Sequence, residues 1–218
     1  MDEYNNIIET IVSIFAYKNN KIEVLLINKK NDPYKGYWVL PNNLVSAKET
    51  IENNALEIIY QLTNIKDIDL YQNKVYSDIS RDRDARVIGM SLTGFIKEET
   101  LHKMINIKNL EIKWFDINEI PKLGYDHSII IAENIEQLKT KANNINTLKN
   151  IFPSLFTLPE LLNFYEILFN KKIDRRNFSK KMKKLNLVVE IGEKSINKIG
   201  RPANLYEFNK DLKENSIF

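Results

Sequence analysis

The pattern of hydrophobic residues changes along this 218-residue chain, and this change constrains the fold more than any other feature. Residues 8–17 and 22–28 are rich in β-branched and aromatic side chains and are separated by three polar residues, which is typical of a β-hairpin. In the last third of the chain, apolar residues recur at helical spacing instead. The polar, asparagine-rich stretch 142–151 separates the two patterns. We therefore predict two domains, at residues 1–145 and 150–218.

The first domain is predicted to have an α+β fold in which helices pack on a mixed sheet. Thr50 is a suitable N-cap for a helix in which five apolar residues form one stripe: Ile51, Ala55, Ile58, Ile59 and Leu62. A second helix is expected from Asp126 to Lys141. Strands are expected at residues 37–40, 70–79, 86–96 and 111–115. Strands, one helix, further strands and a closing helix imply helices layered on a sheet.

The second domain has the element order of a winged helix-turn-helix. Thr157-Leu158-Pro159-Glu160 is a capping-box sequence with proline in the first helical turn. Asp174 caps a second predicted helix, and two strands follow at 187–191 and 203–208. Helix, turn, helix and two-stranded ribbon is the order found in winged DNA-binding domains.

The second helix of this domain predicts DNA binding because its two faces differ. Phe178, Met182 and Leu185 share one face and are expected to be buried. Polar and cationic residues lie away from that face, and these are the candidate DNA-binding residues together with Arg201 in the predicted wing: Arg175, Arg176, Asn177, Lys180 and Lys183. Arginine can pair with guanine, asparagine with adenine, and lysine with phosphate. The alternative is a solvated basic helix with no ligand.

Charge and composition agree with an anionic partner and exclude some chemistry. Residues 151–218 hold 13 Lys and Arg against 8 Asp and Glu, whereas the rest of the chain is slightly acidic. The chain has no cysteine, which excludes disulfides, zinc sites with thiolate ligands and cysteine nucleophiles. The N-terminus lacks the pattern of a signal peptide and no apolar run is long enough to span a bilayer. We therefore expect a cytoplasmic protein without a membrane partner.

The segment from Trp38 to Ile65 resembles the Nudix box, G-x5-E-x7-R-E-U-x-E-E-x-G-U, where U is a bulky apolar residue. Aligning the first glycine with Asn43 places the first glutamate on Glu49, which matches. The arginine position falls on Glu57, and the late glycine falls on Asn64. The three metal-binding glutamates fall on Ile58, Gln61 and Leu62. The resemblance implies a Nudix-like α/β/α sandwich.

The altered box predicts that this domain does not catalyse the family's reaction. Nudix hydrolases cleave diphosphates with Mg²⁺ held by helix carboxylates. Ile58 and Leu62 cannot bind a hard cation, and Gln61 offers only a neutral oxygen. We therefore expect no catalytic residue, no metal and no cofactor. Two alternatives remain: a hydrolase of a nucleoside diphosphate derivative with an unusual metal site, and a protein-interaction module.

Taken together, the chain resembles Nudix-related transcriptional regulators of the NrtR and AraR type. The resemblance is carried by Asp174-Arg175-Arg176-Asn177-Phe178, by 200–206 (Gly-Arg-Pro-Ala-Asn-Leu-Tyr), by 81–87 (Arg-Asp-Arg-Asp-Ala-Arg-Val) and by Tyr125-Asp126-His127. It implies a homodimer, in most cases a repressor, that binds double-stranded operator DNA with two half-sites. It also implies an effector in the Nudix domain: ADP-ribose for NrtR-type regulators of NAD metabolism, and arabinose for AraR-type regulators of sugar use.

The candidate effector-binding residues are Asn43, Glu49, Arg81, Arg83, Arg86 and Asp126. The three arginines could bind the phosphates of a nucleotide-like effector. Alternatively, they form surface ion pairs with Asp82 and Asp84. His127 is expected to support the closing helix rather than to act in catalysis. The sequence does not decide between the effectors.

Overall fold

The computed structural model describes residues 6–103, 110–194 and 204–212. The chain forms two compact units. The first comprises Met1–Ala16, Glu23–Ile96 and Thr100–Gln137. The second comprises Tyr17–Ile22, Lys97–Glu99 and Leu138–Phe218. The tip of the first hairpin therefore belongs to the second unit, although the strands that lead to it lie in the first.

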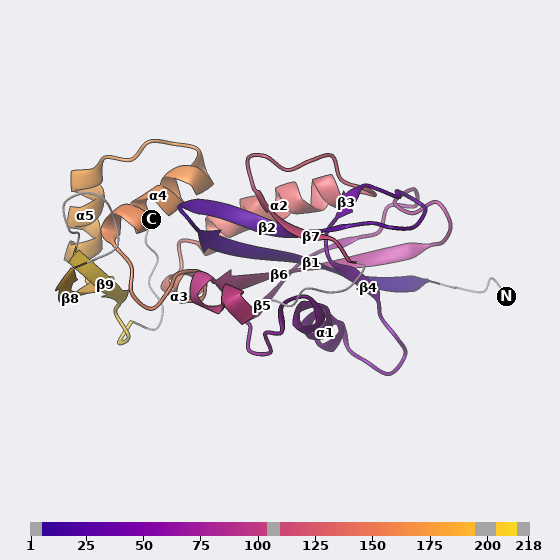
Figure 1. Cartoon of the computed structure of the whole chain (residues 1–218), viewed down its shortest axis with the longest axis horizontal. Coiled ribbons are helices and arrows are strands. Elements are labelled where there is room, and N and C mark those ends of the chain that lie inside the picture. Colours follow the sequence, from indigo (N-terminus) through magenta and orange to yellow (C-terminus); the bar gives the residue numbers. More distant parts are fainter. Residues whose placement is uncertain (1–5, 104–109, 195–203, 213–218) are drawn as a thin grey trace. The chain divides into compact units, whose positions relative to one another are not determined.

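The first unit is built on a seven-stranded sheet with the strand order β3-β2-β1-β6-β5 (Figure 1). Strand β4 also pairs with β1, and β7 pairs with β2. The predicted hairpin is confirmed as β1 and β2. The strands are β1 (Ile7–Lys18), β2 (Lys21–Asn28), β3 (Trp38–Val39), β4 (Asn42–Leu44), β5 (Leu70–Tyr76), β6 (Val87–Lys97) and β7 (Ile112–Asp116).

Two helices pack on opposite faces of this sheet, α1 (Ile51–Thr63) and α2 (His127–Lys141) (Figure 1). A short 3-10 helix, η1 (Glu98–Lys103), follows β6. Helix α1 begins at the predicted N-cap, where the Thr50 side chain accepts from the Asn53 N–H at 3.1 Å. Four residues of the predicted apolar stripe, Ala55, Ile58, Ile59 and Leu62, are buried in a core with β1, β2 and β6, and the fifth, Ile51, is partly buried against it. The predicted α+β sandwich is therefore confirmed.

The second unit contains α3 (Ile145–Ile151), α4 (Leu158–Phe169), α5 (Arg175–Lys184) and a ribbon of β8 (Val188–Lys194) and β9 (Asn204–Phe208). Helix α3 was not predicted, because its segment is rich in asparagine. Asn144 nevertheless caps it by accepting from the Asn146 N–H at 2.8 Å. The predicted capping box of α4 is complete, since Thr157 and Glu160 each accept from the other's backbone N–H.

Aromatic rings form the core of the second unit. The rings of Phe156 and Phe208 lie 4.4 Å apart, and Phe152 contacts both. Phe178 and Met182 of α5 are buried as predicted. Leu185 is 43% exposed, contrary to prediction, because it is the C-cap residue and lies beyond the last turn that packs on the core.

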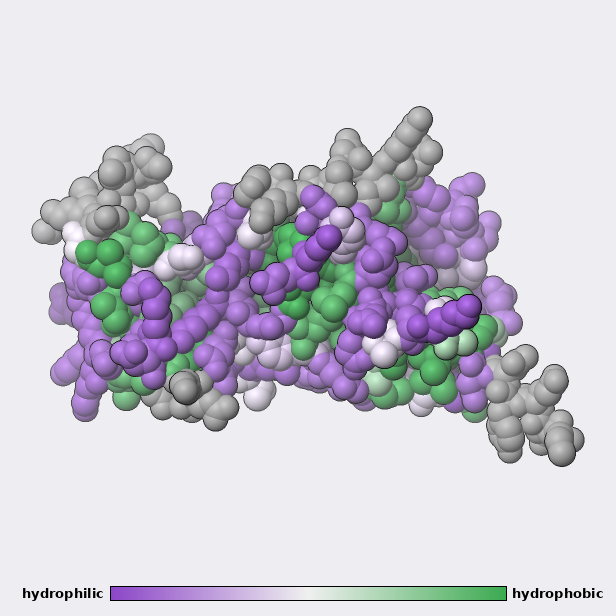
Figure 2. All heavy atoms as spheres, turned by 90° about the horizontal axis from the view of Figure 1, so that it is seen from below, coloured by the Kyte–Doolittle hydropathy of each residue, from purple (hydrophilic) through white to green (hydrophobic). Residues whose placement is uncertain are grey.

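The surface is mainly hydrophilic on the face shown in Figure 2, with hydrophobic patches between the polar areas. Such a mixture is ordinary, because apolar atoms contribute roughly half of a folded protein's surface. Across the described ranges, no helix is both long and apolar enough to cross a membrane.

Candidate functional site

Helix α5 separates its core-facing and outward-facing residues clearly. Asp174 caps the helix by accepting from the Asn177 N–H at 2.8 Å, and Phe178 and Met182 anchor it in the core. The side chains of Arg175, Arg176, Asn177 and Lys180 are exposed. Within residues 6–103, 110–194 and 204–212, these four side chains make no ion pair. The helix therefore presents uncompensated cations together with one amide.

Two other predicted DNA-binding residues differ from these four. The Lys183 ammonium lies 3.1 Å from a carboxylate oxygen of Glu190 on β8, so its charge is already paired. Arg201 and the predicted wing tip at 200–202 lie outside the described residues.

The helix that resembles the Nudix helix, α1, turns two of the family's metal positions into the core. Ile58 and Leu62 are 6% and 4% exposed and pack among Val12, Ile14 and Leu92. Gln61, at the third metal position, is exposed and donates to the Glu57 carboxylate at 2.9 Å. A carboxylate at position 58 or 62 would have to be buried in hydrocarbon, which costs several kcal/mol when the charge is unpaired.

The two ends of the altered Nudix box differ in backbone conformation. Asn64 adopts a left-handed φ of 58° at the position where the motif has glycine. Asparagine tolerates this conformation better than most residues. Glu49 accepts from the Ser46 N–H at 2.7 Å, and this hydrogen bond lowers the pKa of the Glu49 carboxyl. Asn43, at the position of the motif's first glycine, is exposed and lies in strand β4 opposite Thr10.

Arg81 lies buried in an ion-pair cluster rather than on the surface. Its Nε and Nη2 atoms donate to the two carboxylate oxygens of Asp126 at 3.0 and 3.1 Å, and Nη1 donates to Glu9 at 3.1 Å. A Cβ on Gly89 would lie 2.9 Å from Nη2, so glycine is needed there for the guanidinium to approach β6. Burial raises the pKa of Glu9 despite the adjacent Arg81. Arg81 makes two hydrogen bonds to Asp126 and one to Glu9.

The other two candidate arginines have different environments. Arg86 donates to the backbone carbonyls of Ser77 and Asp78 at 2.8 and 3.1 Å, which fixes the loop after β5. Arg83 is exposed, and its guanidinium carbon lies 5.7 Å from the centre of the Tyr34 ring. None of the three arginines forms an ion pair with Asp82 or Asp84 in the part of the chain that the structure describes. Arg83 is therefore the most available of the three cations.

A pocket of about 580 Å³ opens beside this cluster in the first unit. The rings of Tyr34 and Tyr125 lie 4.7 Å apart at its edge, and Lys29 lies 5.5 Å from the Tyr125 ring centre. The Tyr76 hydroxyl donates to Glu133 at 2.8 Å, and burial raises the pKa of Tyr76. The lining residues are Tyr34, Lys74, Val75, Tyr76, Ser77, Asp78, Ser80, Arg81, Tyr125, Asp126, Ile129 and Glu133.

Sequence reasoning found Arg81 and Asp126 in this pocket but missed the tyrosines. Tyr34 and Tyr125 come from separate loops and both have positive φ, 67° and 54°. Neither conformation can be read from residue type, because tyrosine rarely adopts it. The family's Tyr125-Asp126-His127 segment was the only signal available.

His127 supports the fold at the base of the same helix. Its side chain is fully buried, and Nδ1 accepts from the Leu40 N–H at 3.0 Å, so the ring proton lies on Nε2. Burial lowers the pKa of His127 to about 3, and the nearby cations Arg81 and Lys29 add to this effect. The ring is therefore neutral at physiological pH, in agreement with the expected supporting role. Among the described residues, no group of three His, Asp or Glu side chains is arranged to hold a metal ion.

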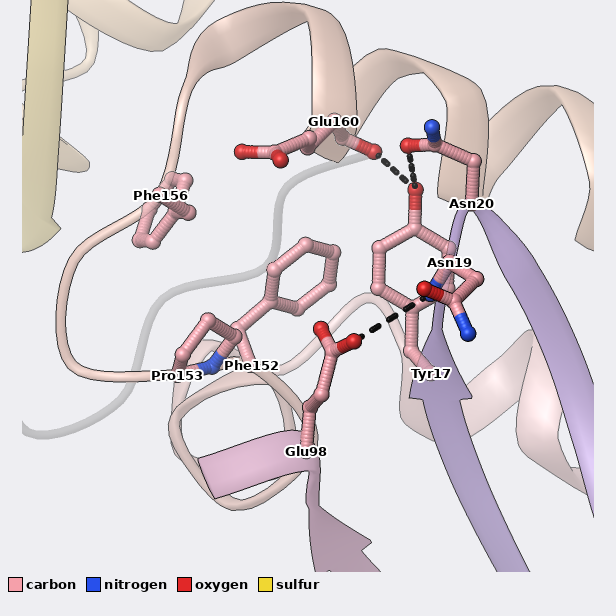
Figure 3. A pocket seen from close by; sticks show the side chains of 8 residues that line it. All are labelled: Tyr17, Asn19, Asn20, Glu98, Phe152, Pro153, Phe156 and Glu160. Atoms are coloured by element: carbon pink, nitrogen blue, oxygen red, sulfur yellow. Dashed lines mark hydrogen bonds between the residues drawn. The ribbon is translucent and has the colours of Figure 1, made fainter. Parts of the chain in front are cut away.

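A second pocket, of about 350 Å³, lies in the second unit (Figure 3). The Tyr17 hydroxyl donates to the Glu160 carbonyl at 2.9 Å and accepts from the Asn163 amide at 3.2 Å. Burial raises the pKa of Tyr17 to about 12. Glu98 points into the space beside Phe152 and accepts from the Asn19 N–H. These contacts hold the hairpin tip against α4 within the unit.

Comparison with known proteins finds a DNA-binding family in the C-terminal part of the chain. Residues 149–208 match the model of the NrtR DNA-binding winged helix domain. The chain is 28% identical over 203 residues to the ADPR responsive transcriptional repressor NtrR of Acinetobacter baylyi, which covers 90% of this chain and 80% of the relative. The chain has the architecture of an NrtR-type regulator.

A solved structure extends this agreement over both domains. Shewanella oneidensis NrtR, complexed with a 27mer DNA, is 26% identical to this chain, with a TM-score of 0.78 and 93% of each chain covered. The chain is also 34% identical over 116 residues to the ADP-ribose pyrophosphatase of Methanocaldococcus jannaschii, covering 53% of this chain and 66% of that protein. The chain is therefore similar in sequence both to a repressor and to a hydrolase.

Proposed function

We propose that this protein is an ADP-ribose-responsive transcriptional repressor that binds operator DNA as a homodimer in the cytoplasm. The observation that carries the proposal is α5, on which the exposed Arg175, Arg176 and Lys180 lack carboxylate partners among the described residues while Phe178 and Met182 are buried in the core. The winged helix match and the similarity to a DNA-bound NrtR support it. A repressor relative described as ADPR responsive supports the choice of effector.

We assign DNA recognition to the exposed residues of α5. Arg175 and Arg176 lie in its first turn, where recognition helices contact base edges, and Asn177 follows. Lys180 lies one turn later and is placed for a phosphate. Arg201 remains a proposed wing contact.

We assign effector binding to the pocket beside Arg81. Tyr34 and Tyr125 offer ring faces for a base, and the exposed Arg83 and the nearby Lys29 offer positive charge for a diphosphate. Arg81 and Asp126 shape the wall and hold each other in place. Asn43 and Glu49 lie in the altered Nudix loop and are proposed only as peripheral contacts.

We further propose that the first domain binds its effector without hydrolysing it. Ile58 and Leu62 lie in the hydrophobic core, where the family's helix would provide carboxylates for Mg²⁺. A neutral amide at Gln61 is a poor substitute, because Mg²⁺ prefers charged oxygen ligands.

The DNA-binding proposal is tested by measuring binding to the DNA upstream of the protein's own gene, by fluorescence anisotropy at several salt concentrations. The full chain is expected to bind this fragment more tightly than unrelated DNA, and Arg176→Ala is expected to weaken binding by about tenfold to a hundredfold. Lys181→Ala is the matched control, because it removes a cation from the same helix on a different side. Equal, salt-labile binding to every fragment would contradict the proposal.

The effector proposal is tested by adding ADP-ribose to the complex and by calorimetry with the free protein. ADP-ribose is expected to release the DNA, and Arg83→Ala is expected to abolish release without changing DNA affinity. Lys30→Ala is the control, because Lys30 pairs with Glu111 on the surface of the same unit. Release that persists in Arg83→Ala would place the effector elsewhere.

The similarity to an ADP-ribose pyrophosphatase favours a second candidate, a hydrolase. It predicts AMP release from ADP-ribose with Mg²⁺ or Mn²⁺ and loss of that activity in Glu49→Gln. Turnover by the wild-type chain would replace the proposal of a non-hydrolysing domain, and no turnover would exclude this candidate.

A further inference from the structure

The carboxylate of Glu190, on β8 in the second unit, accepts hydrogen bonds from several side chains. Its Oε2 atom accepts from the Lys183 ammonium at 3.1 Å and from the Tyr206 hydroxyl at 2.9 Å. Its Oε1 atom accepts from the Asn204 amide. An exposed ion pair alone stabilises little, but a carboxylate that joins several donors in one network contributes more.

This network connects three elements of the winged helix. Glu190 and Tyr206 are direct cross-strand partners in the β8–β9 ribbon. The Tyr206 backbone also pairs in both directions with Phe156, just before α4, at 3.0 and 2.8 Å. Lys183 lies in the last turn of α5 and its ammonium is 5.3 Å from the centre of the Tyr206 ring. The end of the recognition helix is thereby attached to the ribbon, and the ribbon to the segment that starts α4.

The charges in this network oppose the use of Lys183 as a phosphate contact. The hydrogen bonds to Tyr206 and Glu190 raise the pKa of Lys183, and those from Tyr206 and Lys183 lower the pKa of Glu190. If Lys183 moved to a phosphate, Glu190 would lose its cation near a strongly negative surface. Arg176 and Lys180 have no such carboxylate among the described residues, so they can contact DNA without this cost.

We propose that Lys183 is a positioning residue that, with Glu190 and Tyr206, fixes the recognition helix against the ribbon, and that it does not contact DNA. This inference rests on the proposed DNA-binding function. It separates Lys183 from Lys180, which lies on the same side of α5 and is proposed to bind phosphate. It also gives Glu190, an acidic residue in a basic domain, a favourable role in DNA binding.

The sign of the effect of Glu190→Gln tests this inference. If Glu190 positions α5, its neutralisation weakens operator binding by about threefold to tenfold, although it removes a negative charge. If Lys183 contacts phosphate and Glu190 only competes for it, the same change strengthens binding. Glu207→Gln is the matched control, because Glu207 also pairs with a lysine of the second unit, Lys210 at 3.0 Å.

The salt dependence of binding gives an independent measurement. Each phosphate contact contributes about 0.9 to the slope of log affinity against log salt concentration. Lys180→Ala is therefore expected to reduce the slope by about this amount, whereas Lys183→Ala weakens binding and leaves the slope unchanged. The double variant of Lys183→Ala with Glu190→Gln is expected to bind as weakly as either single variant, because both break the same interaction.

The measurements use the full chain and the operator fragment, with circular dichroism to verify folding. If Glu190→Gln does not fold, Tyr206→Phe removes only the hydroxyl that donates to Glu190 and is expected to weaken binding about twofold to threefold. Stronger binding by Glu190→Gln than by Glu207→Gln, or a reduced slope in Lys183→Ala, overturns the inference. If Arg176→Ala and Lys180→Ala also have no effect, the proposed function itself is wrong.

Discussion

Helices α1 and α5 are capped and anchored in the same way, but they differ in which of their positions face the core. Each begins at an oxygen-bearing cap, Thr50 or Asp174, and each buries an apolar stripe. In α1 the buried stripe includes Ile58 and Leu62, the positions at which the Nudix motif has metal ligands. In α5 only Phe178 and Met182 are buried, and the cations remain outside. Glu57 and Gln61 of α1 face solvent, whereas the exposed Arg175, Arg176 and Lys180 of α5 are proposed to bind a ligand.

This difference shows how the residues that face the core decide which positions of a helix remain available for a ligand. Ile58 and Leu62 lie where the Nudix motif has carboxylates, and their hydrophobic contacts with the sheet stabilise the core. In α5, the two anchoring residues are sufficient to hold the helix, which leaves its other positions available for recognition.

The largest effect is expected from returning the motif's glutamate to α1. Ile58→Glu removes a side chain that is 6% exposed and buries a carboxylate without a partner, which should lower the free energy of unfolding of the first unit by about 5 kcal/mol. Both tryptophans, Trp38 and Trp114, lie in this unit, so tryptophan fluorescence during urea unfolding measures it. Gln61→Glu restores another motif residue at an exposed position and should change stability by less than about 0.5 kcal/mol. Equal effects of the two changes would show that position 58 is not a core position.

The corresponding change in α5 is the loss of its main anchor. Phe178→Ala removes a ring that is 3% exposed and lies 5.8 Å from that of Tyr165, and should destabilise the second unit by about 3–4 kcal/mol. Operator binding should be lost, while the tryptophan-monitored unfolding of the first unit should stay nearly unchanged. Phe169→Ala is the control, because that ring is 37% exposed. A variant that retains full operator binding would refute the role of Phe178 as an anchor.

The same contrast explains what the sequence could predict. The faces of α1 and α5 follow from periodicity within one helix, so Ile58, Leu62, Phe178 and Met182 were assigned correctly. Leu185 shares the period of α5 but follows its last turn, and periodicity does not give the end of a helix.

Contacts between distant segments could not be predicted in this way. Arg81 lies next to aspartates in sequence, yet its partners Glu9 and Asp126 are 72 and 45 residues away. The pairing of Lys183 with Glu190 was missed for a related reason. Both residues lie in elements that were predicted, but their contact depends on how the ribbon packs against α5, and local patterns do not encode that packing.

A change in pH should affect the first unit through His127, which lies at the start of the other helix on its sheet. Its pKa is lowered to about 3 by burial, whereas an unfolded histidine has a pKa of about 6.5. Between these values the unfolded chain binds a proton that the folded chain does not. Stability is therefore fully present above pH 6.5 and falls by about 1.4 kcal/mol per unit as the pH decreases.

The measurement is urea unfolding by tryptophan fluorescence at a series of pH values, and His127→Gln is compared with the wild type. Glutamine can still accept from the Leu40 N–H but does not titrate. The contribution of His127 is the difference between the two slopes, because other groups titrate in both proteins. Parallel slopes would mean that His127 takes up its proton at the same pH in the folded and the unfolded chain.

The smallest effects are expected at the two caps, where α1 and α5 are most alike. Thr50→Ala and Asp174→Ala should each destabilise their own unit by about 1 kcal/mol, because each leaves a backbone N–H without its acceptor. Only Asp174→Ala should also weaken operator binding, since fraying of the first turn displaces Arg175 and Arg176.

Asp174 is itself a negative charge beside these arginines, so its removal alone would favour DNA binding. Asp174→Ser separates the two contributions, because serine keeps the cap without the charge. It should bind the operator at least as tightly as the wild type, and weakening equal to that of Asp174→Ala would show that the carboxylate itself, and not the cap, orders the recognition face.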